Sequence, residues 1–470
     1  MATFFILARI LVPADYGVMA VTMFMVGLLD KVTEPGFGDA LVQRKESVEK
    51  YLDAVWTFDL IRYGILSGLL MFGGGWIASF FHLDASQAMI VRAGGILLIL
   101  GALSNIRMVN FARGLEYKKI LIRDIASQIA LGGIAIVVAL TVSASPWALF
   151  AGQLGLYIVG LTFSYLLMPV RPRIDFNFGK LRDLFGFGKW VYVQNLLDYV
   201  FQYFDKLFIG RMLDPNTLGL YSRGKDLGGL VTGIIQSLIG KIAFPALSRV
   251  QGEIHKVQQG FLKSIDVLII LAVPAGLLLS LQGGVIVSFL LGDKWIALTL
   301  ILKIFAIGNL IVAVNAIFQT VFASLGRPEV NVGLHLLQFA LTIPAAWLGF
   351  QIYHAPGLAM GVIATWVVTL GASWFMAGRV FRIGMPSLRP AFWSVLSASL
   401  AVFLLDLLAR NAVLATGNTW IGMGWVACLG AVYLFVMFGV SRVQGAGPWY
   451  TAISVAKELG ILPKILRSKI

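Results

Sequence analysis

The chain has 470 residues, of which 59% are hydrophobic and 13% are charged, and its mean hydropathy is +0.86. A soluble protein is about half apolar and about a quarter charged, so this composition excludes an ordinary soluble domain. Apolar segments of about 20 residues recur from end to end, each long enough to cross about 30 Å of hydrocarbon as a helix. The period-two alternation of an outer-membrane barrel is absent. The sequence therefore predicts an all-α, polytopic membrane protein.

Fourteen transmembrane helices are expected, the first of them truncated. In chain order they cover about 2–12, 16–38, 53–80, 86–106, 120–142, 147–169, 188–210, 217–240, 259–282, 297–322, 329–353, 356–379, 390–409 and 419–440. The first is only about half a bilayer long, and it lacks the basic start and cleavage site of a signal peptide. We expect that the true first helix begins upstream of this chain.

Lysine and arginine are distributed unevenly between the loops. With the N-terminus in the cytoplasm, the loops and tail on that side hold 26 of the 37 Lys and Arg residues, the opposite loops hold three and the spans hold eight. Cytoplasmic loops are enriched in Lys and Arg, so this asymmetry predicts that both termini are cytoplasmic. It assigns the net charge of +14 to the membrane surface and predicts no nucleic-acid partner.

A short repeat indicates that the chain is built from two similar halves. LVPADYGVMA (11–20) and LDPNTLGLYS (213–222) share leucine, proline and glycine at the same spacing, at an offset of 202. Each half holds six spans, so both insert the same way up, and a pseudo-twofold axis along the membrane normal is expected.

Between the halves, residues 171–190 mix aromatic and charged residues, as in an interfacial helix or loop, although a solvated connector fits equally well. The expected domains are an N-terminal six-helix lobe (1–170), a cytoplasmic interfacial linker (171–187), a C-terminal six-helix lobe (188–384), two extra transmembrane helices (385–445) and a cytoplasmic tail (446–470).

Charged residues gather at equivalent positions of the two repeats. A charge at mid-bilayer costs about 2.5–3.5 kcal/mol even on lenient insertion scales, so it usually faces protein or water. Spans one to three carry Arg9, Asp30, Lys31, Glu34, Asp59 and Arg62, and spans seven and eight carry Asp198, Asp205, Lys206, Arg223, Lys225 and Asp226. One interpretation is that these charges pair to hold helices together or snorkel to the interface. The other is a water-filled central cavity between the lobes, lined with positive charge and suited to an anionic headgroup.

Local spacing refines this picture. Asp30 and Glu34 are four residues apart and Asp59 and Arg62 are three apart, so each pair shares a helix face. Pro35 and the glycines after it either let the second span bend or mark its end. The lone Cys428 and four scattered histidines predict no disulfide and no metal site.

Five stretches resemble one known family. PADYG (13–17), PGFGDALVQRKE (35–46), DKLFIGRMLDPNTLGLYSRG (205–224), PALSRVQGE (245–253) and ASLGRPEV (323–330) are similar, in this order, to bacterial oligosaccharide flippases. These flippases move lipid-linked O-antigen and exopolysaccharide repeat units and belong to the multidrug/oligosaccharidyl-lipid/polysaccharide exporter superfamily. The resemblance implies a V of two six-helix lobes in the bacterial inner membrane, with helices one, two, seven and eight at the lobe interface.

The resemblance also implies a substrate and roles for the charges. An undecaprenyl-pyrophosphate-linked oligosaccharide would enter a cationic lumen by alternating access while its polyprenyl tail stays in lipid. Membrane lipids, a polysaccharide polymerase and a chain-length regulator would be partners. The headgroup would be held by Arg9, Lys31, Arg62, Lys206, Arg223 and Lys225. Charge balance, or a coupling H⁺ or Na⁺, would fall to Asp30, Glu34, Asp59, Asp198, Asp205 and Asp226. No other cofactor is expected.

Three alternatives make different predictions. A multidrug cation antiporter of the same superfamily would present mostly carboxylates and aromatic rings to a cavity of net negative potential. A polysaccharide polymerase or glycosyltransferase would need a large extramembrane loop or domain, but no loop between spans reaches thirty residues. A scaffold without transport would not need charges inside the membrane. We therefore expect a transporter and not an enzyme.

Overall fold

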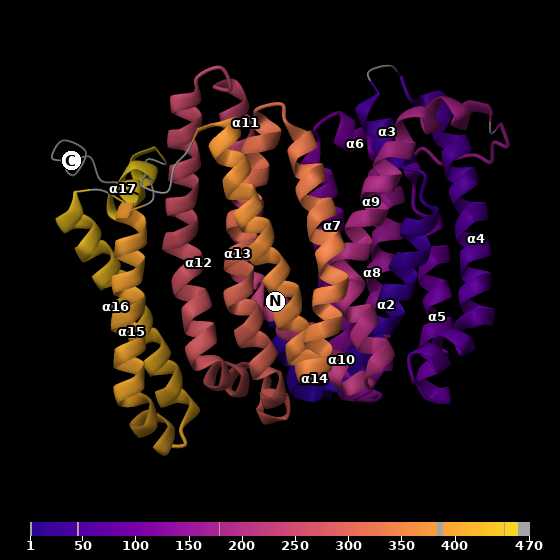
Figure 1. The fold of residues 1–470 in the computed structure, drawn as a ribbon. Helices are drawn as coiled ribbons and strands as arrows, with labels where there is room; N and C mark the ends of the chain where they lie inside the picture. The colour runs from indigo at the N-terminus through magenta and orange to yellow at the C-terminus, as the bar shows by residue number, and fades with distance from the viewer. Residues whose placement is uncertain (1, 45–46, 178, 383–388, 446, 459–470) are drawn as a thin grey trace. The chain divides into compact units, whose positions relative to one another are not determined.

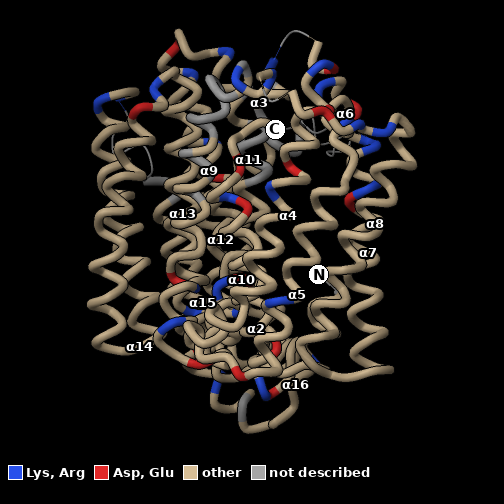
Figure 2. Tube along the Cα trace, turned by 90° about the vertical axis from the view of Figure 1, so that its right-hand side faces the viewer, with Lys and Arg blue, Asp and Glu red and all other residues tan. Residues whose placement is uncertain are grey.

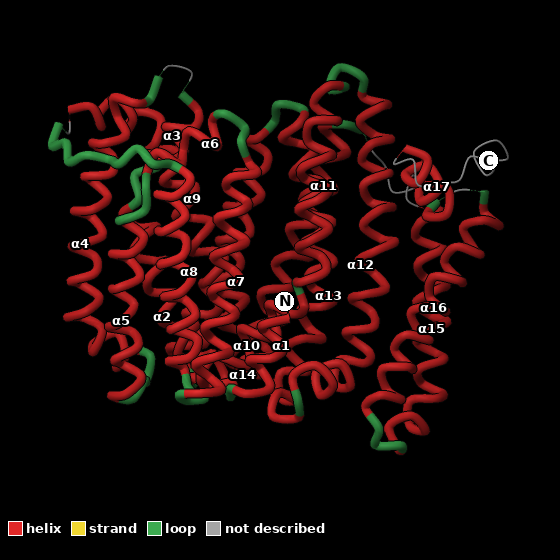
Figure 3. The backbone as a smooth tube through the Cα atoms, turned by 180° about the vertical axis from the view of Figure 1, so that it is seen from behind, coloured by secondary structure: helices red, strands yellow, loops and turns green. Residues whose placement is uncertain are grey.

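A computed structural model describes all residues except 1, 45–46, 178, 383–388, 446 and 459–470 (Figure 1). The described residues form helices and connecting loops, with no strand among them (Figure 3). The chain divides into two compact units, Met1–Ser222 and Arg223–Ile470, and α10 crosses the division. The division falls later than the expected boundary between lobes because α9 packs against α2, α3 and α4. The domain boundaries expected from the sequence stay a prediction.

The first unit is a bundle of antiparallel helices. Its elements are α1 (Ala2–Ile10), α2 (Pro13–Thr33), α3 (Phe37–Gln43), α4 (Glu49–Phe80), α5 (Ala85–Ala102), η1 (Ile106–Met108), α6 (Val109–Arg113), α7 (Tyr117–Thr141), α8 (Pro146–Leu167), α9 (Gly179–Met212) and the start of α10 (Pro215–Gly228). Several begin at residues that favour a helix start: Pro13 and Pro146 stand in the first turns of α2 and α8, and the Asp84 carboxylate caps α5 by accepting from the Gln87 N–H.

One end of this unit is basic, as the loop charges predict. Lys and Arg residues lie around α3 and α6 (Figure 2). The guanidinium of Arg107 is 2.8 Å from the Asp53 carboxylate, and that of Arg113 donates to the Arg44 carbonyl at 2.6 Å. These contacts join α4, η1, α6 and the chain after α3 at the same end. The location of this end in the cytoplasm stays a prediction.

The second part of the expected linker is helical. Residues 179–187 form the first turns of α9, where Leu181 and Leu184 are buried against Phe37 and Tyr51. Just before it, the Lys180 ammonium lies 2.6 Å from the Asp175 carboxylate, and this hydrogen bond lowers the pKa of Asp175. The alternative of a fully solvated connector is therefore wrong for these turns.

The second unit contains the remaining helices. They are the end of α10, α11 (Leu230–Arg249), α12 (Ile254–Leu291), η2 (Asp293–Leu298), α13 (Thr299–Ser324), α14 (Pro328–Val380), α15 (Arg389–Ala415), α16 (Thr419–Gln444) and α17 (Pro448–Glu458). A phenylalanine-rich core joins α12, α13 and the end of α14 through Phe261, Phe318 and Phe381. A separate core, which includes Val402 and Tyr433, packs α15 and α16 against α12.

Helix α14 is two of the expected spans joined by a sharp reversal. Tyr353 and His354 have non-helical dihedrals, with φ +45° at His354. Beyond the reversal the two arms run side by side, and a Cβ placed on Gly357 would lie 2.0 Å from the Gly349 carbonyl oxygen. The arms can approach this closely only because glycine lacks a side chain.

This contact predicts an effect on stability. Gly357→Ala should lower the free energy of unfolding by about 1–3 kcal/mol, because the added methyl group overpacks the arm interface. Gly371→Ala is the control, since a Cβ there meets no atom within 4 Å. Thermal unfolding of the two purified variants measures the difference. Equal midpoints would show that the arms do not meet at these glycines.

By length and composition, ten helices in the described part of the chain can cross a membrane, and α14 counts once among them. Helices also occupy the other expected spans, among them α1 and α10, which have 9 and 14 residues. The chain is therefore a multi-pass membrane protein, while the count of fourteen stays a prediction. The expected tail and the start of the region 385–445 lie partly outside the described residues.

Candidate functional site

The break after α2 creates the candidate site. Helix α2 ends at Thr33, the chain is extended at Glu34, and Gly36 takes φ +72° before α3 begins. The predicted second span therefore ends earlier than expected, and Pro35 follows the end of the helix and does not bend it. This break leaves the last turn of α2, which carries Asp30 and Lys31, facing α4.

Arg62 of α4 is buried against this last turn. Its Nη1 lies 3.1 Å from Asp30 Oδ1 and also donates to the Asp30 carbonyl at 3.2 Å and to the Thr33 hydroxyl at 3.1 Å. Its Nε and Nη2 are each 3.1 Å from Asp59 Oδ1. The pairing of Asp59 with Arg62 confirms that the two residues share a helix face. Arg62 thus links α2 and α4 through two carboxylates.

Neighbouring groups complete this cluster. The Tyr63 hydroxyl donates to Asp30 Oδ1 at 2.6 Å, and the Arg62 guanidinium carbon lies 4.0 Å from the centre of the Tyr63 ring. Lys31 Nζ is bonded to the Glu34 carboxylate and lies 3.8 Å from Asp30 Oδ2. A buried arginine held on several sides needs such partners, because an unpaired charge in hydrocarbon is costly.

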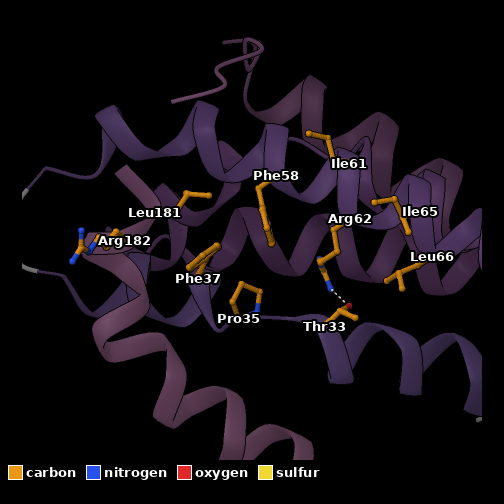
Figure 4. A pocket seen from close by; sticks show the side chains of 10 residues that line it. All are labelled: Thr33, Pro35, Phe37, Phe58, Ile61, Arg62, Ile65, Leu66, Leu181 and Arg182. Atoms are coloured by element: carbon orange, nitrogen blue, oxygen red, sulfur yellow. Dashed lines mark hydrogen bonds between the residues drawn. The ribbon is translucent and has the colours of Figure 1, made fainter. Parts of the chain in front are cut away.

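A cleft of about 750 Å³ opens beside Arg62 (Figure 4). It is bounded by the α2–α3 break, α4 and the first turns of α9, and most of its lining is apolar. Its lining residues are Thr33, Pro35, Phe37, Phe58, Ile61, Arg62, Ile65, Leu66, Leu181 and Arg182. Arg182 lies at the other end of the lining from Arg62, with Phe37 and Pro35 between them, and its guanidinium points away from Arg62 (Figure 4).

The net charge of the Arg62 cluster differs from the positive charge expected for a cationic cavity. The three carboxylates of Asp30, Glu34 and Asp59 outnumber the two cations of Lys31 and Arg62, which gives a net charge of −1. The cations in this part of the chain are therefore paired, as one of the two sequence interpretations expected. An anionic ligand that takes two parallel hydrogen bonds from Arg62 must displace a carboxylate, because Asp59 holds the Nε–Nη2 edge and Asp30 holds Nη1.

Helix α9 runs antiparallel to α2 and brings tyrosines onto it. The Tyr192 hydroxyl donates to the Val32 carbonyl at 2.8 Å, and the Tyr199 hydroxyl donates to the Phe24 carbonyl at 2.7 Å. Tyr199 and Tyr203 stack with their ring centres 4.5 Å apart. This aromatic face fixes the register between the two helices.

A second charged group lies farther along α9. Asp205 is buried, and its carboxylate accepts from the Tyr221 hydroxyl of α10 and from the Lys206 backbone N–H, both at 2.8 Å. The Lys206 ammonium lies 5.4 Å from the centre of the Tyr203 ring. This geometry suits a cation–π contact.

The two groups occupy different depths. The Tyr199–Phe24 hydrogen bond marks one level on α2 and α9. Asp30 lies six residues from Phe24 toward the end of α2. Lys206 lies seven residues from Tyr199 toward the end of α9, which is the opposite direction because the two helices are antiparallel. At 1.5 Å per residue, the Arg62 cluster and Lys206 are therefore separated by roughly 20 Å along the helices. The structure brings Arg62 together with Asp30 and Asp59, but it does not place Lys206 in the same cluster.

The repeated sequences meet at the opposite end of this unit. A Cβ on Gly17 would lie 1.8 Å from the Pro215 carbonyl oxygen, and a Cβ on Gly219 would lie 1.9 Å from the Pro13 carbonyl oxygen. In the repeat, Pro13 corresponds to Pro215 and Gly17 corresponds to Gly219. The glycine of each copy therefore lies against the proline of the other copy, which is the reciprocal pattern of a local twofold relation. The relation between the two whole halves stays a prediction.

The other expected site residues are spread along the chain. Arg9 is exposed near the end of α1. In the second unit, Arg223 and Asp226 pair along α10 at 3.1 Å, and Lys225 lies 5.8 Å from the centre of the Phe305 ring. Asp198 belongs to α9, but its side chain lies outside the described residues. The ligand roles of all these residues stay predictions.

Sequence reasoning missed the neutral partners. Thr33 and Tyr63 bond directly to members of the Arg62 cluster, and Tyr199 and Tyr221 fix α9 against its neighbours. A search restricted to charged residues cannot find them. The signal available was the position of Thr33 and Tyr63 beside charges in otherwise apolar helices.

Comparison with known proteins assigns the family. A family model described as "Polysaccharide biosynthesis protein" matches residues 6–300, which is more than half of the chain. The chain belongs to this family. The matched region includes α2, α4 and α9, so the helices that build the Arg62 cluster and its cleft are part of what the family shares.

Two relatives of this polysaccharide biosynthesis protein share sequence over most of their length. Lipopolysaccharide biosynthesis protein WzxC of Escherichia coli (strain K12) is 22% identical over 377 residues, which cover 79% of this chain and 75% of the relative. Succinoglycan biosynthesis transport protein ExoT of Rhizobium meliloti (strain 1021) is 23% identical over 414 residues, covering 85% and 82%.

Solved structures support the fold. A structure of the lipid II flippase MurJ in an inward closed conformation aligns with a TM-score of 0.76 at 11% identity, over 94% of this chain and 96% of that one. A multidrug resistance transporter of the MATE family in an inward-facing conformation aligns with a TM-score of 0.62 at 13% identity, over 81% and 93%. At these identities the likeness establishes the helical transporter fold and not the substrate.

Proposed function

We propose that this polysaccharide biosynthesis protein is a flippase that carries lipid-linked oligosaccharide repeat units across the bacterial inner membrane by alternating access. The family match over residues 6–300 carries the proposal. The names of the two relatives, one a lipopolysaccharide biosynthesis protein and the other a succinoglycan transport protein, support it. The product would serve O-antigen, capsule or exopolysaccharide synthesis.

In this proposal Arg62 binds the diphosphate of the substrate. The guanidinium lies at the wall of a cleft whose other lining is mostly apolar, so phosphate and lipid chemistry meet there. Arginine suits this role because its planar group donates two parallel hydrogen bonds to a phosphate. The polyprenyl chain stays in the bilayer.

Binding and coupling follow from the carboxylates that hold Arg62. When a diphosphate takes the guanidinium, Asp59 loses its cation and Asp30 keeps only Lys31, 3.8 Å away. Asp59 then bears uncompensated charge in a partly buried site, where taking up H⁺ or Na⁺ stabilises it. The proposal therefore makes anion binding and cation uptake interdependent, with no other cofactor.

Both termini would face the cytoplasm, and a polymerase and a chain-length regulator would act on the flipped product.

A second candidate is a multidrug cation antiporter, and one observation favours it. The Arg62 cluster carries a net charge of −1, with aromatic rings nearby on α4 and α9, which suits a cationic amphipathic substrate. The match to a polysaccharide biosynthesis family outweighs this charge count, because an arginine buried between two carboxylates would repel such a substrate unless it stayed paired.

Transport by purified protein distinguishes the two functions. In proteoliposomes that contain an undecaprenyl-diphosphate-linked oligosaccharide, the protein should move the sugar to the leaflet where an added impermeant glycosidase can cleave it. In protein-free vesicles the glycosidase should cleave the outer-leaflet oligosaccharide, and the oligosaccharide of the inner leaflet should be cleaved only slowly. If the oligosaccharide stays protected while an entrapped fluorescent cation such as ethidium is exchanged for protons, the flippase proposal is wrong and the antiporter is correct.

A further inference from the structure

A separate cleft of about 290 Å³ lies in the second unit, at the end where α12 leads into η2 and α15 leads into α16. Helix α12 departs from helical dihedrals at Gln282, which lines the cleft. Gly284, Gly417 and Gly422 also line it, and their lack of side chains helps to keep it open. The remaining walls come from Ser288 and neighbours on α12, Ile296, the end of α15 and the start of α16.

A buried carboxylate stands behind this cleft. Asp406 of α15 is only 3% exposed, and its Oδ1 accepts hydrogen bonds from the side chain of Gln282 and, at 3.1 Å, from the Trp425 indole N–H. Both donors are neutral. The negative charge of Asp406 is therefore held by hydrogen bonds between α12, α15 and α16 and is not cancelled by them.

Two cations lie around the same point. Arg410 is one turn beyond Asp406 and lines the cleft, and the stem of Lys303 packs beside Gly283 on α12. Lys303 is close enough to Arg410 and Asp406 for their charges to interact. Among the described residues, neither Lys303 nor Arg410 has a hydrogen-bond or ion-pair partner. Of the residues that line the cleft, Arg410 is the charged one, so the lining carries a local charge of +1.

We propose that this cleft binds the phosphodiester of an anionic phospholipid headgroup, such as phosphatidylglycerol. A phosphodiester carries one negative charge, which matches the local charge of +1, whereas a diphosphate would leave an excess of negative charge. The Thr419 hydroxyl and the side-chain amide of Asn418 line the cleft and supply polar contacts around the phosphate, whereas the Ser288 hydroxyl is bonded to the Asp293 carboxylate. Arg410 provides the paired N–H groups that phosphate geometry favours.

The surroundings place a lipid, and not a soluble anion, in this cleft. Trp420 is 74% exposed at the start of α16, as expected for an aromatic residue at the membrane interface. Leu407 and Leu408 follow Asp406 on α15 and are strongly exposed. They lie between Arg410 and the middle of the helix. A headgroup at Arg410 would therefore place its acyl chains along exposed leucine side chains. This inference does not depend on which substrate the protein transports.

Lipid binding to the full-length protein tests the proposal. Native mass spectrometry in detergent, with phosphatidylglycerol or phosphatidylcholine added, should show a retained phosphatidylglycerol and no retained phosphatidylcholine. Each cation near a membrane surface is worth about fivefold in binding, so Arg410→Gln should weaken the retained lipid about fivefold and K303Q/R410Q about thirtyfold. Lys294→Gln is the matched control, because Lys294 is an exposed cation of η2 at the same end but does not line the cleft.

Charge-preserving variants separate binding from folding. Lys303→Arg with Arg410→Lys keeps both charges beside Asp406 and should retain phosphatidylglycerol. If it does, and K303Q/R410Q keeps the wild-type unfolding temperature in neutral lipid but loses the lipid, the site is supported. Equal retention by all variants would overturn it. Displacement of the lipid by millimolar inorganic phosphate, or stronger retention of undecaprenyl diphosphate at the same residues, would also overturn the headgroup assignment.

Discussion

Arg62→Gln should abolish flipping of the lipid-linked oligosaccharide, with at least a hundredfold loss of initial rate in proteoliposomes. The glutamine cannot offer a charged bidentate contact to the diphosphate. It also leaves Asp59 without a cation and Asp30 with only Lys31, 3.8 Å away, and breaking a buried ion pair from one side costs about 3–5 kcal/mol of stability. Thermal unfolding and flipping are measured on the same preparation, because the single variant changes both.

A triple variant separates the two effects. In D30N/D59N/R62Q the two asparagines replace the orphaned carboxylates, so most of the lost stability should return. Flipping should stay absent, because the residue that binds the diphosphate is still missing. Arg62→Lys keeps the charge but loses the planar geometry, and we expect intermediate flipping. A triple variant that flips at the wild-type rate would show that Arg62 is a structural link only.

Gly17→Ala and Gly219→Ala should each prevent the close contact between α2 and α10. The new methyl group would lie within 2 Å of a carbonyl oxygen of the opposite helix, so the two helix ends must move apart. We expect a loss of about 1–3 kcal/mol in the free energy of unfolding from each change, together with a strong fall in flipping. The two substitutions should have similar effects, because the contact is reciprocal.

Gly64→Ala is the matched control for this contact. Gly64 is also helical, but a Cβ there meets no atom within 4 Å, so the change should raise helix stability slightly through the better propensity of alanine. Wild-type unfolding temperatures for both Gly17→Ala and Gly219→Ala would mean that the helix ends are not in contact in the protein.

Much of the fold follows from apolar length and from the position of breaks. A helix that crosses hydrocarbon must satisfy its backbone internally, so long apolar runs such as α7 and α8 could be placed from the sequence to within a few residues. The α14 reversal falls between two expected spans, 329–353 and 356–379. The early end of α2 was not predicted, because the expected span 16–38 continues through Asp30 to Glu34. Pro35 instead favours an extended conformation at Glu34, so the helix ends at Thr33.

The site was harder to predict because pairing depends on packing. The spacing of Asp59 and Arg62 on one helix face is a local property, and it predicted their contact correctly. The meeting of Arg62 with Asp30 depends on how α4 packs against α2, and that information is spread over many apolar residues. The neutral hydroxyl groups of Thr33 and Tyr63 give no charge signal. No role was predicted for the buried Asp406, because its partners Gln282 and Trp425 come from other helices and are brought to it by packing.

The most direct test of the central claim is a structure of the protein with an undecaprenyl-diphosphate-linked oligosaccharide bound. The account predicts a phosphate oxygen at hydrogen-bond distance, about 3 Å, from the Arg62 guanidinium, with at least one of the carboxylates of Asp30 and Asp59 turned away from it. A bound diphosphate elsewhere in the protein, with Arg62 still paired to both carboxylates, would contradict it.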